Sequence, residues 1–265
     1  MGKDTMTAAL VGGLLAVAAP AAAQDLHPLP AHPDGLEWPT EAGPTCGDAP
    51  DALAPLGEEA MASTRGDALG ESRAVVVVHG GRIVAEAYGD GFGPDTKLIS
   101  WSMAKSITSA LVGRAMQLGL IESVDDVMPT PFADGDPRGD RTWADWLTMT
   151  DGLDNMEIAA TSLSESDAAQ SLFGKGRKDV AAYAVEALDV AHPPGEHWNY
   201  STLGLTLVGR AAGLALDPDE SAPADDFDRV LFDPIGADIQ PEFDAAGNFL
   251  GGALAWASAH DDAEF

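Results

Sequence analysis

The pattern of apolar and polar residues predicts a β-hairpin near the start of the main apolar region. A β-branched run at residues 75–78 is followed by Gly80 and Gly81 and then by a second apolar run at residues 83–88. Two such runs joined by two glycines are typical of a tight hairpin. Before them, residues 50–64 carry apolar side chains at helical spacing and predict a helix.

Several longer apolar patterns with helical spacing follow the hairpin. The longest runs from about Ser102 to Leu118, where Gly119 is a natural stop. A short amphipathic helix is predicted where Trp143, Trp146 and Leu147 share one face, and Gly152 breaks it. Further helices are predicted at residues 177–188, 202–216 and 225–239, the last capped by a turn, with loop or irregular structure at 153–178 and 191–201.

The number of predicted strands is small for a chain with this many helices. One hairpin alone does not make an independently stable sheet. No further strand is predicted after residue 245, so we expect part of a sheet to be missing.

Composition and charge narrow the class of partner. The chain has 265 residues and 45% hydrophobic content, enough for one sizeable core or two small lobes that share an interface. Its net charge is −29, which disfavours nucleic acid and anionic lipid as partners. The acidic residues are spread along the chain and indicate a solvated surface; adaptation to high salt is an open alternative.

The N-terminus has the features of an export signal. Lys3 precedes the apolar run "AALVGGLLAVAAP" and the small residues "AAAQD", which predicts cleavage after Ala23. The expected organisation is a signal peptide at 1–23, an extended lead-in at 24–49 and one main domain at 50–265, in a protein exported to the periplasm. The apolar run is too short for a comfortable membrane span. The alternative to an export signal is a buried N-terminal helix. Cys46 is the single cysteine, so no intrachain disulfide is possible.

A serine and a lysine at the start of the longest helix are the candidate chemistry. Ser102 and Lys105 are three residues apart, which puts them on one helix face with Cβ atoms about 5–6 Å apart. A serine nucleophile needs a base, and a lysine serves when it is neutral. The helix N-terminus and apolar neighbours both disfavour the ammonium form. Ser100 is the predicted N-cap. The alternative is a capped helix with a surface lysine.

Several longer segments share a resemblance with one known superfamily. "LISWSMAKSITSALVGRAMQLGLI" with "SVDDVM", "TWADWLTMTDGLD", "AHPPGEHWNYSTLGLTLVGR", "FDPIGA" and "GGALAWASAHD" resemble landmarks of the serine β-lactamase and penicillin-recognising superfamily. The likeness runs from about residue 72 to residue 265. It is greatest for the class C and family VIII esterase branch, and within it for enzymes similar to 6-aminohexanoate-dimer hydrolases.

The resemblance implies a fold and roles for individual residues. It implies an α/β (α+β) fold, β-lactamase/transpeptidase-like, with an antiparallel sheet flanked by helices and a mostly helical lobe. Ser102 would be the acylated nucleophile, and its backbone N–H an oxyanion donor. Lys105 would be the base and Tyr200 the proton shuttle. Thr202 stands where much of the superfamily has a substrate-contacting Asn, and Trp198 is a candidate for the pocket wall.

One family motif is missing from the sequence. The superfamily carries a Lys/His-x-Gly segment on a later strand, and no acceptable candidate is present here, which predicts a C-terminally truncated family member. The expected function is a serine hydrolase that forms an acyl-enzyme on small linear amides, short esters or β-lactams, without a cofactor. The alternative is a non-catalytic remnant, or a weak peptide- or β-lactam-binding protein. The histidines do not have the spacing of a metal site. The sequence does not indicate an oligomeric state.

Overall fold

The computed structural model describes residues 35, 53–62, 71–218 and 223–265. The chain divides into two units, Met1–Gly35 and Leu36–Phe265, and every element described below lies in the second unit. The predicted signal peptide at 1–23, Cys46 and the predicted boundary after residue 49 lie outside the described residues.

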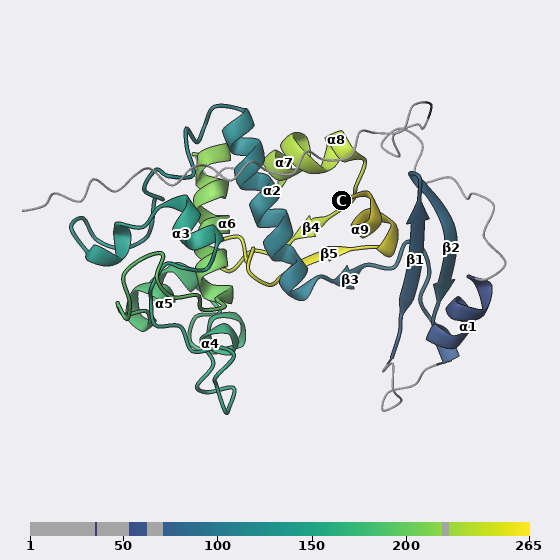
Figure 1. Cartoon of the computed structure of the whole chain (residues 1–265), viewed down its shortest axis with the longest axis horizontal. Helices are drawn as coiled ribbons and strands as arrows, with labels where there is room; N and C mark the ends of the chain where they lie inside the picture. The colour runs from purple at the N-terminus through teal and green to yellow at the C-terminus, as the bar shows by residue number, and fades with distance from the viewer. Residues whose placement is uncertain (1–34, 36–52, 63–70, 219–222) are drawn as a thin grey trace, which may run out of the picture. The chain divides into compact units, whose positions relative to one another are not determined.

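The predicted hairpin is confirmed. Strand β1 (Ala74–His79) pairs antiparallel with β2 (Arg82–Tyr88). Gly80 and Gly81 both have positive φ, 61° and 74°, a conformation that glycine adopts without a steric penalty. Helix α1 (Ala54–Ala62) packs against β1 and β2, as Figure 1 shows, within the region predicted to be helical.

A second, smaller sheet corrects the expectation of no strand after residue 245. Strands β3 (Leu98–Ile99), β5 (Ala255–Ala257) and β4 (Gln240–Pro241) form it in the order β3-β5-β4, with antiparallel pairing. These strands have two or three residues each, too few for alternation of apolar and polar positions to be visible in a sequence. The antiparallel sheets and flanking helices confirm the predicted α/β class.

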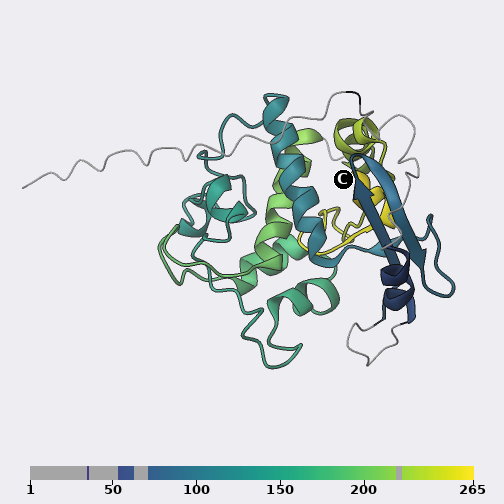
Figure 2. The same ribbon diagram turned by 45° about the vertical axis from the view of Figure 1, so that its right-hand side comes forward.

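Two long helices lie side by side at the centre of the buried apolar cluster. Helix α2 (Ala104–Gln117) packs along α6 (Thr202–Leu216), an arrangement seen in both Figures 1 and 2. Helix α6 is apolar on nearly all sides, which is typical of a helix buried within a domain. Ser201 caps it, because its hydroxyl accepts a hydrogen bond from the backbone N–H of Gly204 at 2.8 Å.

The remaining helical elements are shorter than these two helices. They are η2 (Pro137–Gly139), α3 (Trp143–Leu147), α4 (Asp167–Phe173), α5 (Val180–Ala187), α7 (Pro223–Phe227), the π-helical η3 (Asp228–Phe232), α8 (Asp233–Ile235) and α9 (Ala259–Glu264). Helix α4 lies in a region predicted to be loop, so that prediction was wrong there. Ser166 caps α4 by accepting a hydrogen bond from the backbone N–H of Ala169. The polar composition of this stretch favoured a loop, so the capping serine was not recognised as the start of a helix.

The start of the longest predicted helix also differs from expectation. A 3₁₀ turn, η1 (Trp101–Met103), precedes α2, and Ser100 makes no side-chain cap. Instead, the Ser100 hydroxyl accepts from the backbone N–H of Ala255 at 3.0 Å and donates to the Trp101 carbonyl at 3.1 Å. Ser100 therefore ties the 3₁₀ turn η1 to β5, through a contact with a residue 155 positions away in the chain that sequence spacing does not reveal.

Candidate active site

The structure brings the predicted serine and lysine into direct contact. The Lys105 Nζ lies 3.0 Å from the Ser102 Oγ, within hydrogen-bond distance. Ser102 is exposed in the 3₁₀ turn η1, whereas Lys105 sits in the first turn of α2 with 8% of its surface exposed. A reachable hydroxyl therefore faces a buried amine, which is the arrangement that a nucleophile and its base require.

Two further groups hold the amine of Lys105. It donates to the carbonyl oxygen of Gly252 at 2.5 Å and to the Thr202 Oγ1 at 3.0 Å. These groups come from the segment before β5 and from the first residue of α6. A neutral amine has two N–H donors and one lone pair. If the two donors go to Gly252 and Thr202, the lone pair faces Ser102.

Thr202 is a partner of Lys105 and is itself fully enclosed. It is 3% exposed, and its hydroxyl donates to Glu157 Oε1 at 2.7 Å while its backbone N–H donates to Glu157 Oε2 at 2.7 Å. The substrate contact predicted for Thr202 stays a prediction, since the described contacts of the hydroxyl are with Lys105 and Glu157.

Glu157 is the residue that sequence reasoning missed. It lies between α3 and α4, in a stretch predicted only as loop. Its neighbour Asn155 donates from Nδ2 to the Tyr200 carbonyl at 2.8 Å, and Asn199 donates from Nδ2 to the Asn155 carbonyl at 2.9 Å. This loop is therefore hydrogen-bonded to the segment that leads into α6. A single glutamate in a polar loop carried no periodic or motif signal that would have identified it.

Tyr200 contacts Lys105 through its ring. The Lys105 Nζ lies 4.7 Å from the ring centroid, the geometry of a cation–π contact when the amine is charged. Among the described residues, no hydrogen bond joins the Tyr200 hydroxyl to Ser102 or Lys105. The proton-shuttle role therefore stays a prediction that requires the hydroxyl to turn toward the reacting atoms.

Two exposed aromatic side chains belong to the segments that carry Ser102 and Tyr200. Trp198 is 58% exposed and its ring lies 6.3 Å from that of Tyr200, while Trp101 is exposed and makes an edge contact with Phe173 at 6.4 Å. Trp101 has φ 45°, a left-handed conformation that a bulky residue adopts at a cost of about 1–3 kcal/mol. The strained backbone therefore comes directly before Ser102.

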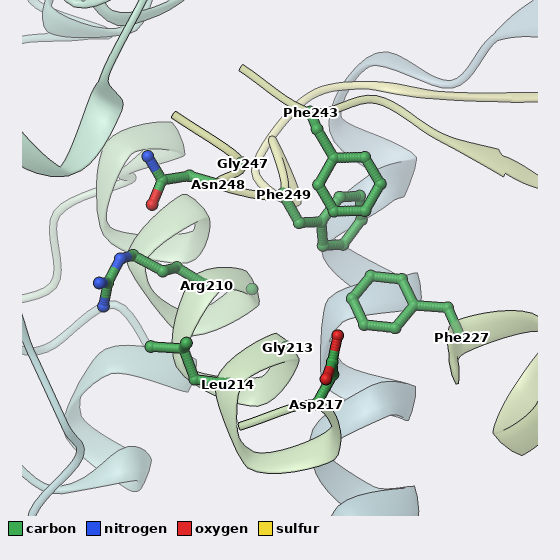
Figure 3. Close-up of a pocket in the computed structure, with 10 residues that line it drawn as sticks. Arg210, Gly213, Leu214, Asp217, Phe227, Phe243, Gly247, Asn248 and Phe249 are labelled. Carbon is green, nitrogen blue, oxygen red and sulfur yellow. The ribbon is translucent and has the colours of Figure 1, made fainter. Parts of the chain in front are cut away.

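The described residues also contain a large, mostly apolar cavity of about 420 Å³ between α1 and the β1–β2 hairpin, and neither Ser102 nor Lys105 lines it. The described residues contain no group of three or more His, Cys, Asp or Glu side chains placed to hold a metal ion. None of the described helices is long and apolar enough to cross a membrane. The cavity in Figure 3, between the C-terminal half of α6 and the rings of Phe227, Phe243 and Phe249, has a volume of about 20 Å³. That volume holds roughly one water, so the cavity is too small for a substrate.

Comparison with known proteins places this geometry in a family. Residues 59–238 match the family model described as Beta-lactamase. A solved structure from Bacillus anthracis, assigned as a 6-aminohexanoate-dimer hydrolase, is similar with a TM-score of 0.58 and 20% identity over 73% of this chain and 52% of that one. No curated protein matched the chain.

Two further solved structures have the same architecture. A class C beta-lactamase from Rhodobacter sphaeroides is similar with a TM-score of 0.50 and 20% identity, over 72% of this chain and 58% of that one. A D-stereospecific amidohydrolase from a Streptomyces species has a TM-score of 0.51 and 16% identity, over 73% of this chain and 65% of that one. These identities show the fold alone, and the chain spans only about half to two thirds of these relatives.

The family match extends over more than half of the chain and covers both Ser102 and Lys105, as well as Glu157, Tyr200 and Thr202. The solved structures support the same α/β architecture of antiparallel sheets and many helices. The chain therefore belongs to the beta-lactamase family, whose members are serine hydrolases.

Proposed function

We propose that this protein is a serine hydrolase that forms an acyl-enzyme on Ser102 with small linear amides or esters as substrates. The observation that carries the proposal is the 3.0 Å contact between the Ser102 Oγ and the buried Lys105 Nζ. The remaining two partners of that amine are a carbonyl and a hydroxyl, both able to accept its hydrogens.

In the proposed reaction, neutral Lys105 takes the hydroxyl proton of Ser102 as the Oγ attacks the substrate carbonyl. The backbone N–H of Ser102 lies in the first turn of a helix, where N–H groups lack intrahelical partners, and would stabilise the oxyanion. When the carbonyl–leaving-group bond breaks, the proton passes from Lys105 through the Tyr200 phenol to the leaving amine or alcohol. Water then hydrolyses the acyl-Ser102 ester and restores the free hydroxyl.

The preference for linear amides and esters over β-lactams rests on Thr202. Much of the superfamily has an Asn at this position that contacts the substrate amide, whereas Thr202 is enclosed by Lys105 and Glu157. The solved relatives include an assigned 6-aminohexanoate-dimer hydrolase and a D-stereospecific amidohydrolase, names that agree with linear amides. Export to the periplasm is part of the proposal and rests on residues 1–23, outside the described residues.

A fluorophosphonate probe tests the nucleophile. The probe is expected to label the wild-type chain and not Ser102→Ala, because phosphonylation requires an activated serine hydroxyl. Ser106→Ala is the matched control, since Ser106 is an exposed serine in the first turn of α2, which directly follows η1, and the variant should label normally. Labelling that persists in Ser102→Ala would remove Ser102 from this role.

The alternative is a chain that binds peptides or β-lactams weakly without turnover. One observation favours it, namely the missing hydrogen bond between the Tyr200 hydroxyl and either Ser102 or Lys105. Ester turnover together with a cooperative thermal transition would refute the binding-only interpretation. A folded chain that neither labels nor hydrolyses esters would support it.

A further inference from the structure

We infer that Glu157 is a positioning residue for acylation, which sets the direction of the hydrogen bonds around Lys105 so that the lone pair of the amine faces Ser102. This inference rests on the proposed function and deepens it, because it explains which proton Lys105 is ready to accept. Glu157 does not touch the reacting atoms; it acts through Thr202.

The argument starts from the two contacts between Glu157 and Thr202. Glu157 Oε1 lies 2.7 Å from the Thr202 Oγ1 and Oε2 lies 2.7 Å from the Thr202 backbone nitrogen. An ionised carboxylate only accepts hydrogen bonds. The single hydroxyl hydrogen of Thr202 is therefore directed at Glu157, and the Thr202 oxygen is left to accept from Lys105.

The Gly252 carbonyl imposes the same direction from the other side. A carbonyl oxygen can only accept, and it lies 2.5 Å from the Lys105 Nζ. With Thr202 and Gly252 both accepting, the two N–H bonds of a neutral amine are used. Ser102 Oγ lies 3.0 Å from the nitrogen. When the amine is neutral, Ser102 is therefore the partner left to donate a hydroxyl proton to the lone pair. Without Glu157, Thr202 is free to donate to the same lone pair and compete with Ser102.

The test measures the rate of fluorophosphonate labelling of Ser102 as a function of pH in Glu157→Gln. This reaction isolates the Ser102–Lys105 step, because fluoride leaves without needing a proton from Tyr200. The labelling rate constant is expected to fall by about 10- to 100-fold, as for a misdirected base. The acid limb of the pH profile is expected to move, because the variant replaces the carboxylate that contacts Thr202 with a neutral amide.

Glu165→Gln is the matched control. Glu165 accepts hydrogen bonds from the backbone nitrogen of Thr161 at 3.1 Å and from the Thr161 Oγ1 at 2.7 Å. Glu157 makes the same pair of contacts with Thr202, but Glu165 is exposed, in the same loop between α3 and α4. It should label at the wild-type rate with an unmoved profile. The effect of Glu157→Gln should also largely disappear in a Thr202→Val background, where the hydroxyl that transmits it is absent.

The outcomes separate this inference from the proposed function. If the wild-type chain does not label, the proposed function fails and the inference falls with it. If the wild type labels but Glu157→Gln has the same rate and pH profile, the inference alone is overturned. A rate that falls only in proportion to the folded fraction, with the acid limb unmoved, also overturns it in favour of a purely structural role.

Discussion

Replacing Gly252 with alanine is expected to damage the active site more than the fold. Gly252 has no room for a side chain, since an added Cβ would lie 2.0 Å from the Thr202 carbonyl oxygen and 2.6 Å from the Thr206 Oγ1. Ordinary van der Waals contacts of a Cβ begin near 3.4 Å. The segment that contains Gly252 must therefore move away from α6 by about 1 Å, as in an overpacked core.

The size of that movement determines whether the stability of the fold or the labelling rate of Ser102 falls more. Overpacking costs about 1–3 kcal/mol, while domains of this kind have about 5–15 kcal/mol of stability, so most molecules should stay folded. The Lys105 Nζ now lies 2.5 Å from the Gly252 carbonyl oxygen, and a shift of about 1 Å stretches this contact to the limit of a hydrogen bond. A misplacement of that size in a catalytic group reduces rates by about 10²-fold.

The assay combines urea unfolding with fluorophosphonate labelling of the folded chain. Gly252→Ala should lose roughly 1–3 kcal/mol of stability and about 10²-fold in labelling rate. Gly113→Ala is the matched control, since its added Cβ meets nothing within 4 Å and α2 should gain roughly 0.5–1 kcal/mol from the better helix former. A Gly252→Ala chain with wild-type stability and labelling would refute the close packing of this segment against α6.

Three further predictions concern the proton relay, a helix cap and acid stability. Tyr200→Phe keeps the ring against Lys105, so labelling should stay near the wild-type rate while amide turnover falls by about 10²–10⁴-fold, measured side by side. Thr142→Ala removes the capping box that Thr142 and Asp145 form on α3 and should cost about 1 kcal/mol in urea unfolding. Hydrogen bonds from Arg138 lower the pKa of Asp136 to about 2, so their contribution is complete above the usual pKa of 3.8 and is lost as the pH falls toward 2. Asp136→Asn should weaken that decline between pH 4 and 2 when unfolding is compared with wild type, and an unchanged decline would contradict the assignment.

The hairpin and the main helices could be predicted because their signals are local. The Gly80–Gly81 turn requires positive φ at both positions, and the structure has it at both. The end of α2 near Gly119, which has φ 75°, is equally a property of a few neighbouring residues. Such features depend on backbone sterics that operate within one turn, so tertiary packing did not need to be known.

The short strands and the irregular C-terminal helices could not be predicted in the same way. Strand β5 exists because Ser100 and Leu98–Ile99 pair with it across more than 150 residues. Its three residues, Ala255–Ala257, have no alternation that would separate a strand from a buried turn. The predicted helix at 225–239 is divided into α7, η3 and α8, with Pro234 in α8 and a left-handed Gly236 at its end. The predicted terminal turn is therefore present. The π-helix η3 could not be predicted, because the hydrophobic pattern does not distinguish it from an α-helix.

The candidate site follows the same division between local and tertiary information. The spacing of Ser102 and Lys105 is a helical property, and the sequence predicted their contact correctly. The other hydrogen-bond partners of the Lys105 amine could not be predicted from this spacing. They matter because a lysine at that position can act as a base only if those partners accept hydrogen bonds from it. Those partners, Thr202 and Gly252, lie 97 and 147 residues further along the chain. The packing of α2 against α6 and of the segment before β5 against both therefore supplies the acceptors that surround the amine. In the proposed mechanism these acceptors direct the lone pair of Lys105 at Ser102, and Glu157 acts on that direction through Thr202.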